Sequence, residues 1–132
     1  MILKFQNIYR FNNKHRKATI LIRAVKYEFK GTLKESAASW MHNMKNKYEW
    51  KNVITVGERE TILDGKNAYW RYYKYKIHSS SDMHEKIYLV NFNKTMYQFR
   101  FFSMGINTYK ETINDFENLV HSVKFTDNAF RE

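Results

Sequence analysis

The chain of 132 residues contains no cysteine and no proline. Without cysteine, disulfide bonds and catalysis by a thiolate are excluded. This absence fits a cytosolic protein, and it also fits an exported protein that needs no oxidation. Without proline, no turn is stiffened by a fixed φ angle and no proline-rich linker divides the chain. Turns and boundaries therefore have to be recognised from other residues.

Long apolar runs are missing as well. No stretch approaches the ~20 residues of a transmembrane helix. Residues 1–7 lack the apolar core of a signal peptide. As written, the sequence predicts a cytoplasmic protein, and it predicts an exported one if the N-terminus has been trimmed.

Acidic residues are few: the chain has 13 acidic and 23 basic residues, which give a net charge of +10. A charge this large indicates affinity for something anionic, namely nucleic acid, an acidic membrane or an acidic protein. The alternative is a Lys- and Asn-rich composition of AT-rich coding sequence, with the lysines on solvated faces. The sequence contains no dense basic run, which favours this second interpretation.

Aromatic residues are abundant: ten Tyr, ten Phe and three Trp make up 17% of the chain. Such residues favour strands and bury large areas, so we expect a fold centred on a sheet. The length and the 43% of hydrophobic residues suit one domain with a real core, spanning residues 1–132.

Two hairpins are predicted from their turns. Asp64-Gly65 tolerates the positive φ angles of a tight turn and joins two β-rich runs. Asn93-Lys94 joins a second pair of apolar, alternating runs. With two earlier strands, the second of which stops before Gly31, the predicted strands cover residues 2–11, 18–29, 53–63, 67–78, 85–92 and 95–103, with polar turns at 12–17 and 79–82.

Two helices are predicted from capping boxes, in which a Thr hydroxyl and a Glu carboxylate three residues later bond reciprocally to backbone N–H groups. Thr32 and Glu35 begin a helix over residues 33–48, and Thr108 and Glu111 begin one over residues 109–121. Their apolar stripes predict four buried side chains: Trp40, Met44, Phe116 and Val120.

The element order ββαββββα describes an antiparallel sheet with two helices packed on it, which is an α+β domain. Residues 122–125 are expected to add a short extended segment. The end of the chain, residues 125–132, is expected to be a loose tail.

With this order, the chain resembles the PsbP-like superfamily of α/β/α sandwiches over residues 18–125. The resemblance rests on the following pieces: residues 18–22, Leu33-Lys34-Glu35 followed by Trp40 and Met44, residues 64–69, Tyr88-Leu89-Val90 with residues 96–99, and Tyr109 before residues 116–125. The strand pair with Pro and Trp that usually opens the family has no match before Ala18, which indicates a shortened N-terminus. Arg71 stands where an apolar residue is expected, so it pairs with a buried acid or its face is open to solvent.

The resemblance implies a non-catalytic binding domain. Members include photosystem accessory proteins, a nuclear-import factor that binds a small GTPase, bacterial lipoproteins of unknown role and adaptor chaperones of type VI secretion effectors. A secretion-associated adaptor, chaperone or immunity-like role is consistent with that list. No catalytic motif of the family exists to be carried over.

Residues that could carry chemistry are scattered. His78 and His84, with Asp82 and Glu85, form one candidate metal cluster, and exposed loop histidines are the simpler interpretation. Neither a nucleophile elbow nor a phosphate-binding glycine loop is present. We therefore expect no catalytic residue, no metal and no cofactor, although a cone-like α+β small-molecule-binding protein or enzyme remains an alternative.

The run from Trp70 to Lys76 interleaves aromatic and basic side chains. This pattern is typical of an amphipathic strand. It also occurs in proteins whose aromatic side chains stack on nucleic-acid bases and whose basic side chains contact phosphates. We expect a protein or peptide partner to bind an aromatic sheet surface, with nucleic acid or an acidic membrane as the alternative. A slip of one residue in register would exchange the exposed face. The candidate surface, placed on one side of two strands, consists of Trp70, Tyr72, Lys74, Arg100 and Phe102.

Overall fold

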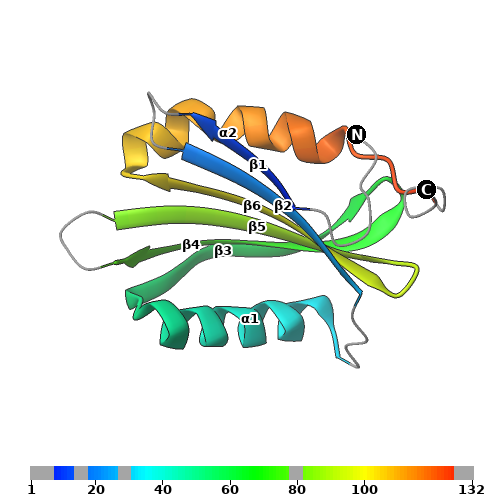
Figure 1. The fold of residues 1–132 in the computed structure, drawn as a ribbon, viewed down its shortest axis with the longest axis horizontal. Coiled ribbons are helices and arrows are strands. Elements are labelled where there is room, and N and C mark those ends of the chain that lie inside the picture. The colour runs from blue at the N-terminus through cyan, green and yellow to red at the C-terminus, as the bar shows by residue number, and fades with distance from the viewer. Residues whose placement is uncertain (1–7, 14–17, 27–30, 78–81, 127–132) are drawn as a thin grey trace.

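Six strands and two helices follow one another in the order ββαββββα (Figure 1). The computed structural model describes residues 8–13, 18–26, 31–77 and 82–126. The elements are β1 (Ile8–Asn13), β2 (Ala18–Lys26), α1 (Leu33–Tyr48), β3 (Lys51–Leu63), β4 (Lys66–Lys76), β5 (Asp82–Phe92), β6 (Thr95–Met104) and α2 (Ile106–His121).

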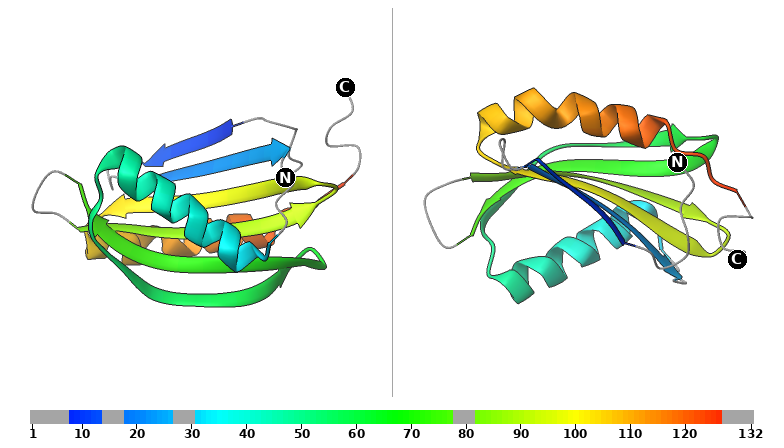
Figure 2. Two further views of the ribbon diagram at one scale, coloured as in Figure 1. Left: turned by 90° about the horizontal axis from the view of Figure 1, so that it is seen from below. Right: turned by 45° about the horizontal axis from the view of Figure 1, so that its top comes forward.

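The strands form one antiparallel sheet in the order β1-β2-β6-β5-β4-β3. Helix α1 lies on one side of the sheet and α2 on the other (Figures 1 and 2). The predicted α+β architecture is thus confirmed. The first strand ends later than predicted, because Asn12 and Asn13 pair with Thr19 and Ala18 instead of forming a turn, while the predicted strand residues 2–7 lie outside the described residues.

Both predicted hairpins are present. Leu63 pairs with Lys66 across Asp64 and Gly65, whose φ angles are 49° and 74°. Phe92 pairs with Thr95 across Asn93 and Lys94, whose φ angles are 50° and 59°. Two successive positive φ angles match the twist of the flanking strands, so each two-residue turn sets the register of its hairpin.

Helix α1 begins as predicted. The Glu35 N–H donates to Thr32 Oγ1 at 3.1 Å, and the Thr32 N–H donates to Glu35 Oε1 at 3.3 Å. The helix ends at Glu49, whose φ of 55° and ψ of 43° are left-handed. The capping box therefore fixes the residue at which α1 begins.

The second capping box was predicted wrongly. Helix α2 begins at Ile106, its N-cap is Gly105, and no side chain caps it. The reason lies in the sheet, because the Gly105 N–H donates to the Asp82 carbonyl at 2.9 Å and closes the end of the β5–β6 pair. Gly105, with a φ of 81°, then turns the chain directly into the helix, so Thr108 lies inside the first turn.

Each face of the sheet has its own core. On the α2 side, Phe116 and Val120 are fully buried, as predicted, against strand residues that include Ile22, Phe99 and Phe101. On the α1 side, Ala37 and Met41 of the helix are buried with Trp50 against three tyrosines of β4, namely Tyr69, Tyr73 and Tyr75. The sheet is therefore apolar on both faces.

Two residues that were predicted to be buried, Trp40 and Met44, are only half-buried. The helix turns Ala37 and Met41 toward the sheet, which leaves Trp40 and Met44 at the margin. The tryptophan that is buried in the core on this side is Trp50, which follows the helix. Its ring stacks on that of Tyr75 with centroids 3.8 Å apart.

The segment after α2 forms no strand, but it packs on the sheet. Val123 and Phe125 are buried, and the Phe125 N–H donates to Asp64 Oδ2 at 2.9 Å. Phe125 therefore belongs to the core rather than to a tail. Residues 127–132, like the predicted turn residues 14–17 and 79–81, lie outside the described residues, and Asp82, which was predicted to be in the second turn, begins β5.

Replacing Thr32 by Ala tests the cap of α1. We expect the free energy of unfolding to fall by about 1 kcal/mol, because the first turn loses its side-chain acceptor. Urea denaturation measures the loss. Thr108→Ala is the matched control and should change stability by much less, since Thr108 caps nothing; equal losses for both variants would contradict the assignment of the two helix starts.

Candidate functional site

Each helix covers only part of its face of the sheet. Helix α1 packs mainly on β4 and β5, and helix α2 mainly on β6, β2 and β5. The view from below shows α1 crossing the sheet with β1 and β2 beside it rather than beneath it (Figure 2). The less covered areas are therefore diagonally opposed: β3 and β4 on the α2 side, and β1, β2 and part of β6 on the α1 side.

The five residues of the predicted surface are divided between these areas. Tyr72 pairs with Lys86, which pairs with Phe101, so these three side chains share the α2 side. Tyr73 pairs with Glu85, which pairs with Phe102, so these share the α1 side. Trp70, Tyr72 and Lys74 thus lie on one face, while Arg100 and Phe102 lie on the other, and the prediction of a common side was wrong.

The error arose at the β4–β5 connection. The β5–β6 register follows from its two-residue turn, but β4 and β5 are joined by residues 77–81, whose length sets no fixed pairing. Lys76 pairs with Asp82, and this register matches even-numbered residues of β4 with odd-numbered residues of β6. Because strand side chains alternate, a change of one residue in that pairing exchanges the faces.

On the α2 side, an open area borders the helix. We call it the α2-side strip and define it by Ile54, Gly57, Trp70, Tyr72 and Lys74. Ile54 is 51% exposed, and the other four residues are half-buried. The Trp70 ring lies beside Gly57, where an added Cβ would make ordinary van der Waals contact with it at 3.5 Å. The strip is thus an aromatic shelf that begins where α2 stops covering the sheet.

The aromatic side chains of this strip are held in place from the helix side. The Tyr72 ring stacks on Tyr109 of α2 with centroids 4.6 Å apart, and its hydroxyl lies 2.7 Å from Nδ1 of His84. Burial lowers the pKa of His84, which favours the neutral ring at this hydrogen bond. Lys86 Nζ lies 4.1 Å from the centroid of Trp70. The shelf is therefore preformed.

Arg100 is occupied inside the protein. Its Nε and Nη2 donate to the two carboxylate oxygens of Glu85 at 2.7 and 3.1 Å. The carboxylate is fully buried and also accepts from the Tyr75 hydroxyl at 2.9 Å. The guanidinium lies 4.6 Å from the ring centroid of Trp40. Arg100 therefore has a structural role beneath α1, and the Glu85 carboxylate raises its pKa further despite its burial.

Of the two alternatives predicted for Arg71, pairing with an acid is the one observed, but the acid is not buried. Arg71 is buried beneath α1, and its Nε lies 3.2 Å from Glu58 Oε2 and 3.0 Å from the Tyr69 hydroxyl. Glu58 itself lies at the surface, where Lys34 also contacts it at 3.0 Å. The hydrogen bond from Tyr69 is the first cause of a lowered Glu58 pKa. The cluster ties β3 to β4 and to the first turn of α1.

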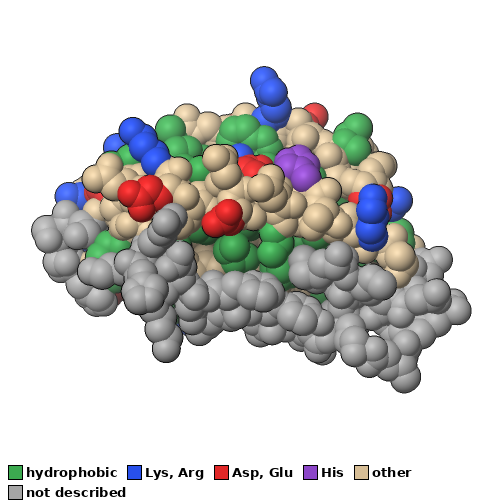
Figure 3. Space-filling model, turned by 90° about the horizontal axis from the view of Figure 1, so that it is seen from above, with side chains coloured by type: hydrophobic (Ala, Val, Ile, Leu, Met, Phe, Trp, Pro, Cys, Tyr) green, Lys and Arg blue, Asp and Glu red, His purple; other side chains and the backbone are tan. Residues whose placement is uncertain are grey.

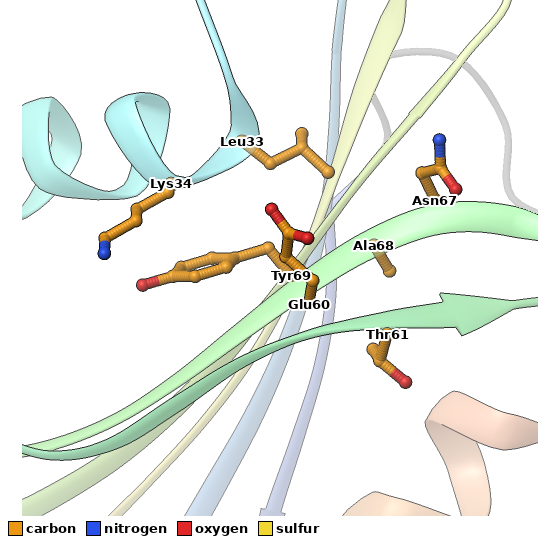
Figure 4. A pocket seen from close by; sticks show the side chains of 7 residues that line it. All are labelled: Leu33, Lys34, Glu60, Thr61, Asn67, Ala68 and Tyr69. Carbon is orange, nitrogen blue, oxygen red and sulfur yellow. The ribbon is translucent and has the colours of Figure 1, made fainter.

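A pocket of about 280 Å³ lies between that first turn and the β3–β4 ladder. Figure 4 shows Leu33 and Lys34 of the helix above the two strands, with Glu60 and Tyr69 pointing toward them. The sequence contained no signal for it, because it depends on how the helix sits on the hairpin. Its lining consists of Leu33, Lys34, Glu60, Thr61, Asn67, Ala68 and Tyr69.

Groups suited to metal binding do not gather in the described part of the chain, where no three His, Asp or Glu side chains could hold an ion together. His78 lies outside that part, and His84 is buried against Tyr72. No helix among the described residues is long and apolar enough to cross a membrane. Seen from the α2 side, Lys and Arg side chains stand apart with acidic side chains among them (Figure 3).

Comparison with known proteins identifies the fold. No family model and no curated protein matches the sequence. Among solved structures, PA94 from Pseudomonas aeruginosa, of unknown function, matches with a TM-score of 0.71 at 9% identity, over 89% of this chain and 81% of its own. Cyanobacterial PsbP from Synechocystis sp. PCC 6803 matches with a TM-score of 0.60 at 10% identity, over 89% of this chain and 91% of its own.

A third match is the Ran-binding protein Mog1p of Saccharomyces cerevisiae, with a TM-score of 0.55 at 10% identity, over 75% of this chain and 56% of its own. Together these likenesses show the PsbP-like fold, as the resemblance implied. Identities this low carry the fold and no residue of a functional site.

Replacing Arg100 by Met tests the buried ion pair. The variant should lose about 3–5 kcal/mol of unfolding free energy, because Glu85 is left charged and without its cation in the core. Urea denaturation measures the loss. The double variant Glu85→Gln/Arg100→Met should recover part of it; a double variant no more stable than the single one would show that the charge of Glu85 is not the cause.

Alkaline pH tests the buried tyrosines. Burial raises the pKa of Tyr69 and of Tyr97 to about 12, and it also raises the pKa of Tyr72, Tyr73, Tyr75, Tyr88 and Tyr109. Above pH 10.0, the ordinary tyrosine value, the folded state keeps protons that the unfolded state loses. Stability is therefore unaffected below that pH and falls as pH rises beyond it.

Phenolate absorbance and circular dichroism, recorded during one alkaline titration, measure this effect. We expect most phenolate to form in the same step in which the secondary structure is lost. Ionisation of most tyrosines near pH 10.0 with the fold intact would contradict the burial of these rings.

Proposed function

We propose that this protein is a non-catalytic interaction module that binds a partner protein or peptide at the α2-side strip. The observation that carries the proposal is a preformed aromatic shelf on a part of the sheet that its own helix leaves open. Trp and Tyr side chains of this kind dominate binding energy at protein interfaces, because they bury large rigid surfaces at little entropic cost.

The chemistry of the strip indicates what the partner presents. Ile54 and the half-buried rings of Trp70 and Tyr72 offer apolar area. At the margin, Lys74 and the exposed Arg59 have no ion pair among the described residues. A partner with apolar side chains and neighbouring carboxylates would satisfy both features, which accords with the net charge of +10.

The opposite face is a weaker candidate. Phe102 is half-buried, but its neighbour Arg100 is already bound by Glu85 and covered by Trp40. Of the five residues in the predicted surface, Trp70, Tyr72 and Lys74 therefore remain in the proposal. The structurally similar Mog1p is a Ran-binding protein, which supports protein binding as the class of function. An adaptor or chaperone in secretion is one setting in which such a module would act.

Affinity capture from cells of the source organism tests this surface. Wild type and the Trp70→Ala/Lys74→Ala variant are used as baits, with Phe102→Ala as the matched control on the other face. We expect the first variant to lose a specific partner that wild type and Phe102→Ala retain, because only the first removes strip contacts.

Circular dichroism and thermal unfolding establish that each bait is folded. Equal capture by all three proteins would remove the α2-side strip from consideration. Capture of nucleic acid or acidic vesicles that fades steeply with salt and ignores Trp70 would replace the proposal by electrostatic binding.

A further inference from the structure

Strand β3 is an edge of the sheet. It pairs with β4 on one side, and its outer side has no ladder partner among the described residues. Irregular pairing is confined to its first half, between Lys51 and Gly57. From Gly57 to Leu63 the pairing with β4 is unbroken, so this segment presents a regular outer row of backbone donors and acceptors.

The edge also exposes apolar side chains, two in its irregular half and one, Ile62, in the regular segment. Ile54, Val56 and Ile62 are 51%, 53% and 63% exposed and are among the most exposed large hydrophobic residues described. A long edge with exposed β-branched residues is a template for pairing with another extended segment. Irregular pairing interrupts the first half of β3. From Gly57 to Leu63 the exposed charges of Glu58, Arg59 and Glu60 oppose indiscriminate pairing, so an added strand has to match them.

The two sides of this regular segment differ in charge. Pairing with β4 places Glu60 and Ile62 on the α1 side with Tyr69 and Asn67, and it places Arg59 and Thr61 on the α2 side with Trp70 and Ala68. Glu60 and Arg59 are exposed, and neither has an ion pair among the described residues. An added strand would therefore meet a free carboxylate on one side and a free guanidinium on the other.

Each side also offers apolar contact. On the α1 side, the pocket beside Leu33 opens next to Glu60 (Figure 4). On the α2 side, Arg59 pairs directly with Trp70, so an added strand would continue the α2-side strip. Main-chain hydrogen bonds supply affinity in such strand addition, and pockets for alternate side chains supply specificity.

A second copy of the chain is a poor occupant of this edge. Antiparallel self-pairing about a twofold axis at Glu60 would place the two Glu60 side chains opposite each other. An axis at Arg59 would oppose the two arginines and bring Glu58 against Glu60. Like charges directly opposite destabilise a strand pair. A twofold axis also keeps each side chain on its own face, so within residues 57–63 no register brings a basic residue opposite Glu60 or an acidic one opposite Arg59, and only a different sequence can match both charges.

We propose that an extended segment of a partner protein adds to β3 over residues 57–63, with a basic side chain facing Glu60, an acidic side chain facing Arg59 and an apolar side chain at the pocket beside Leu33. If the added strand is antiparallel to β3, its residues from N- to C-terminus are an apolar residue opposite Ile62, any residue opposite Thr61, a basic residue opposite Glu60 and an acidic residue opposite Arg59. The inference rests on the proposed interaction function and specifies the partner's conformation and charge order.

Two synthetic probes of identical composition test the charge order. Both are capped threonine-rich peptides of about nine residues, a length that matches a typical strand. The matched probe carries Leu-Thr-Lys-Glu at its centre and the swapped probe carries Leu-Thr-Glu-Lys. Amide chemical shifts of the full chain, followed over a titration, measure binding of each probe.

The matched probe should bind about tenfold more tightly, since the swapped probe exchanges two favourable cross-strand charge pairs for two repulsive ones. It should also slow hydrogen exchange of β3 amides. The variant Arg59→Glu/Glu60→Lys should reverse the preference and bind the swapped probe more tightly. Both replaced side chains are exposed and unpaired, so the fold should be retained, which circular dichroism checks.

Equal binding of the two probes, no binding of either, or an unreversed preference in the variant would overturn strand addition at β3. These outcomes are separable from failure of the proposed function. If strand addition fails while Trp70→Ala/Lys74→Ala still loses its partner, the strip binds without the edge. If the probes behave as expected while capture is unchanged by that variant, the edge binds without the strip.

Discussion

The ion pair between Glu85 and Arg100 is the constraint on which the arrangement of this sheet depends. A fully buried carboxylate is tolerated only when a cation and further donors surround it, and here Arg100 and Tyr75 supply them. A shift of one residue between β5 and its neighbours would carry Glu85 to the other face, away from all of these partners. The pair thus defines which side chains of β4, β5 and β6 face α1, and it seats Trp40 above the guanidinium.

Once the side chains of each sheet face are fixed, the positions of the two helices determine which of them remain accessible to a partner. Each packs on one part of its face, so the aromatic sheet is not fully covered on either side. On the α1 side the two arginines beneath the helix are paired, Arg100 with Glu85 and Arg71 with Glu58. On the α2 side Trp70 and Tyr72 are supported from the helix and open toward β3. There Arg59 of β3 and Lys74 of β4 have no ion pair among the described residues. Unsatisfied charge beside preformed aromatic area is therefore concentrated near one edge of the sheet.

Proteins that share this fold with 9–10% identity to the chain show how little of it depends on particular residues. What such a fold requires is two-faced apolar strands, tight hairpin turns and two amphipathic helices. The groups at the β3 edge and the pocket beside Leu33 are not among these requirements. They belong to this chain's own sequence, so its binding properties have to be argued from its own residues.

Local features could be predicted from the sequence because neighbouring residues determine them. The capping box of Thr32, the turns at Asp64-Gly65 and Asn93-Lys94, and the β5–β6 register that the second turn imposes all depend on a few adjacent dihedral angles. That register already implied that Glu85 and Arg100 lie on the same face, a signal that sequence reasoning missed. Three features were decided only by the tertiary structure: the pairing of β4 with β5, the N-cap of α2 at Gly105, and the burial of Trp50 rather than Trp40 in the core. Each depends on contacts between segments far apart in the chain, where a shift of one residue exchanges inside for outside.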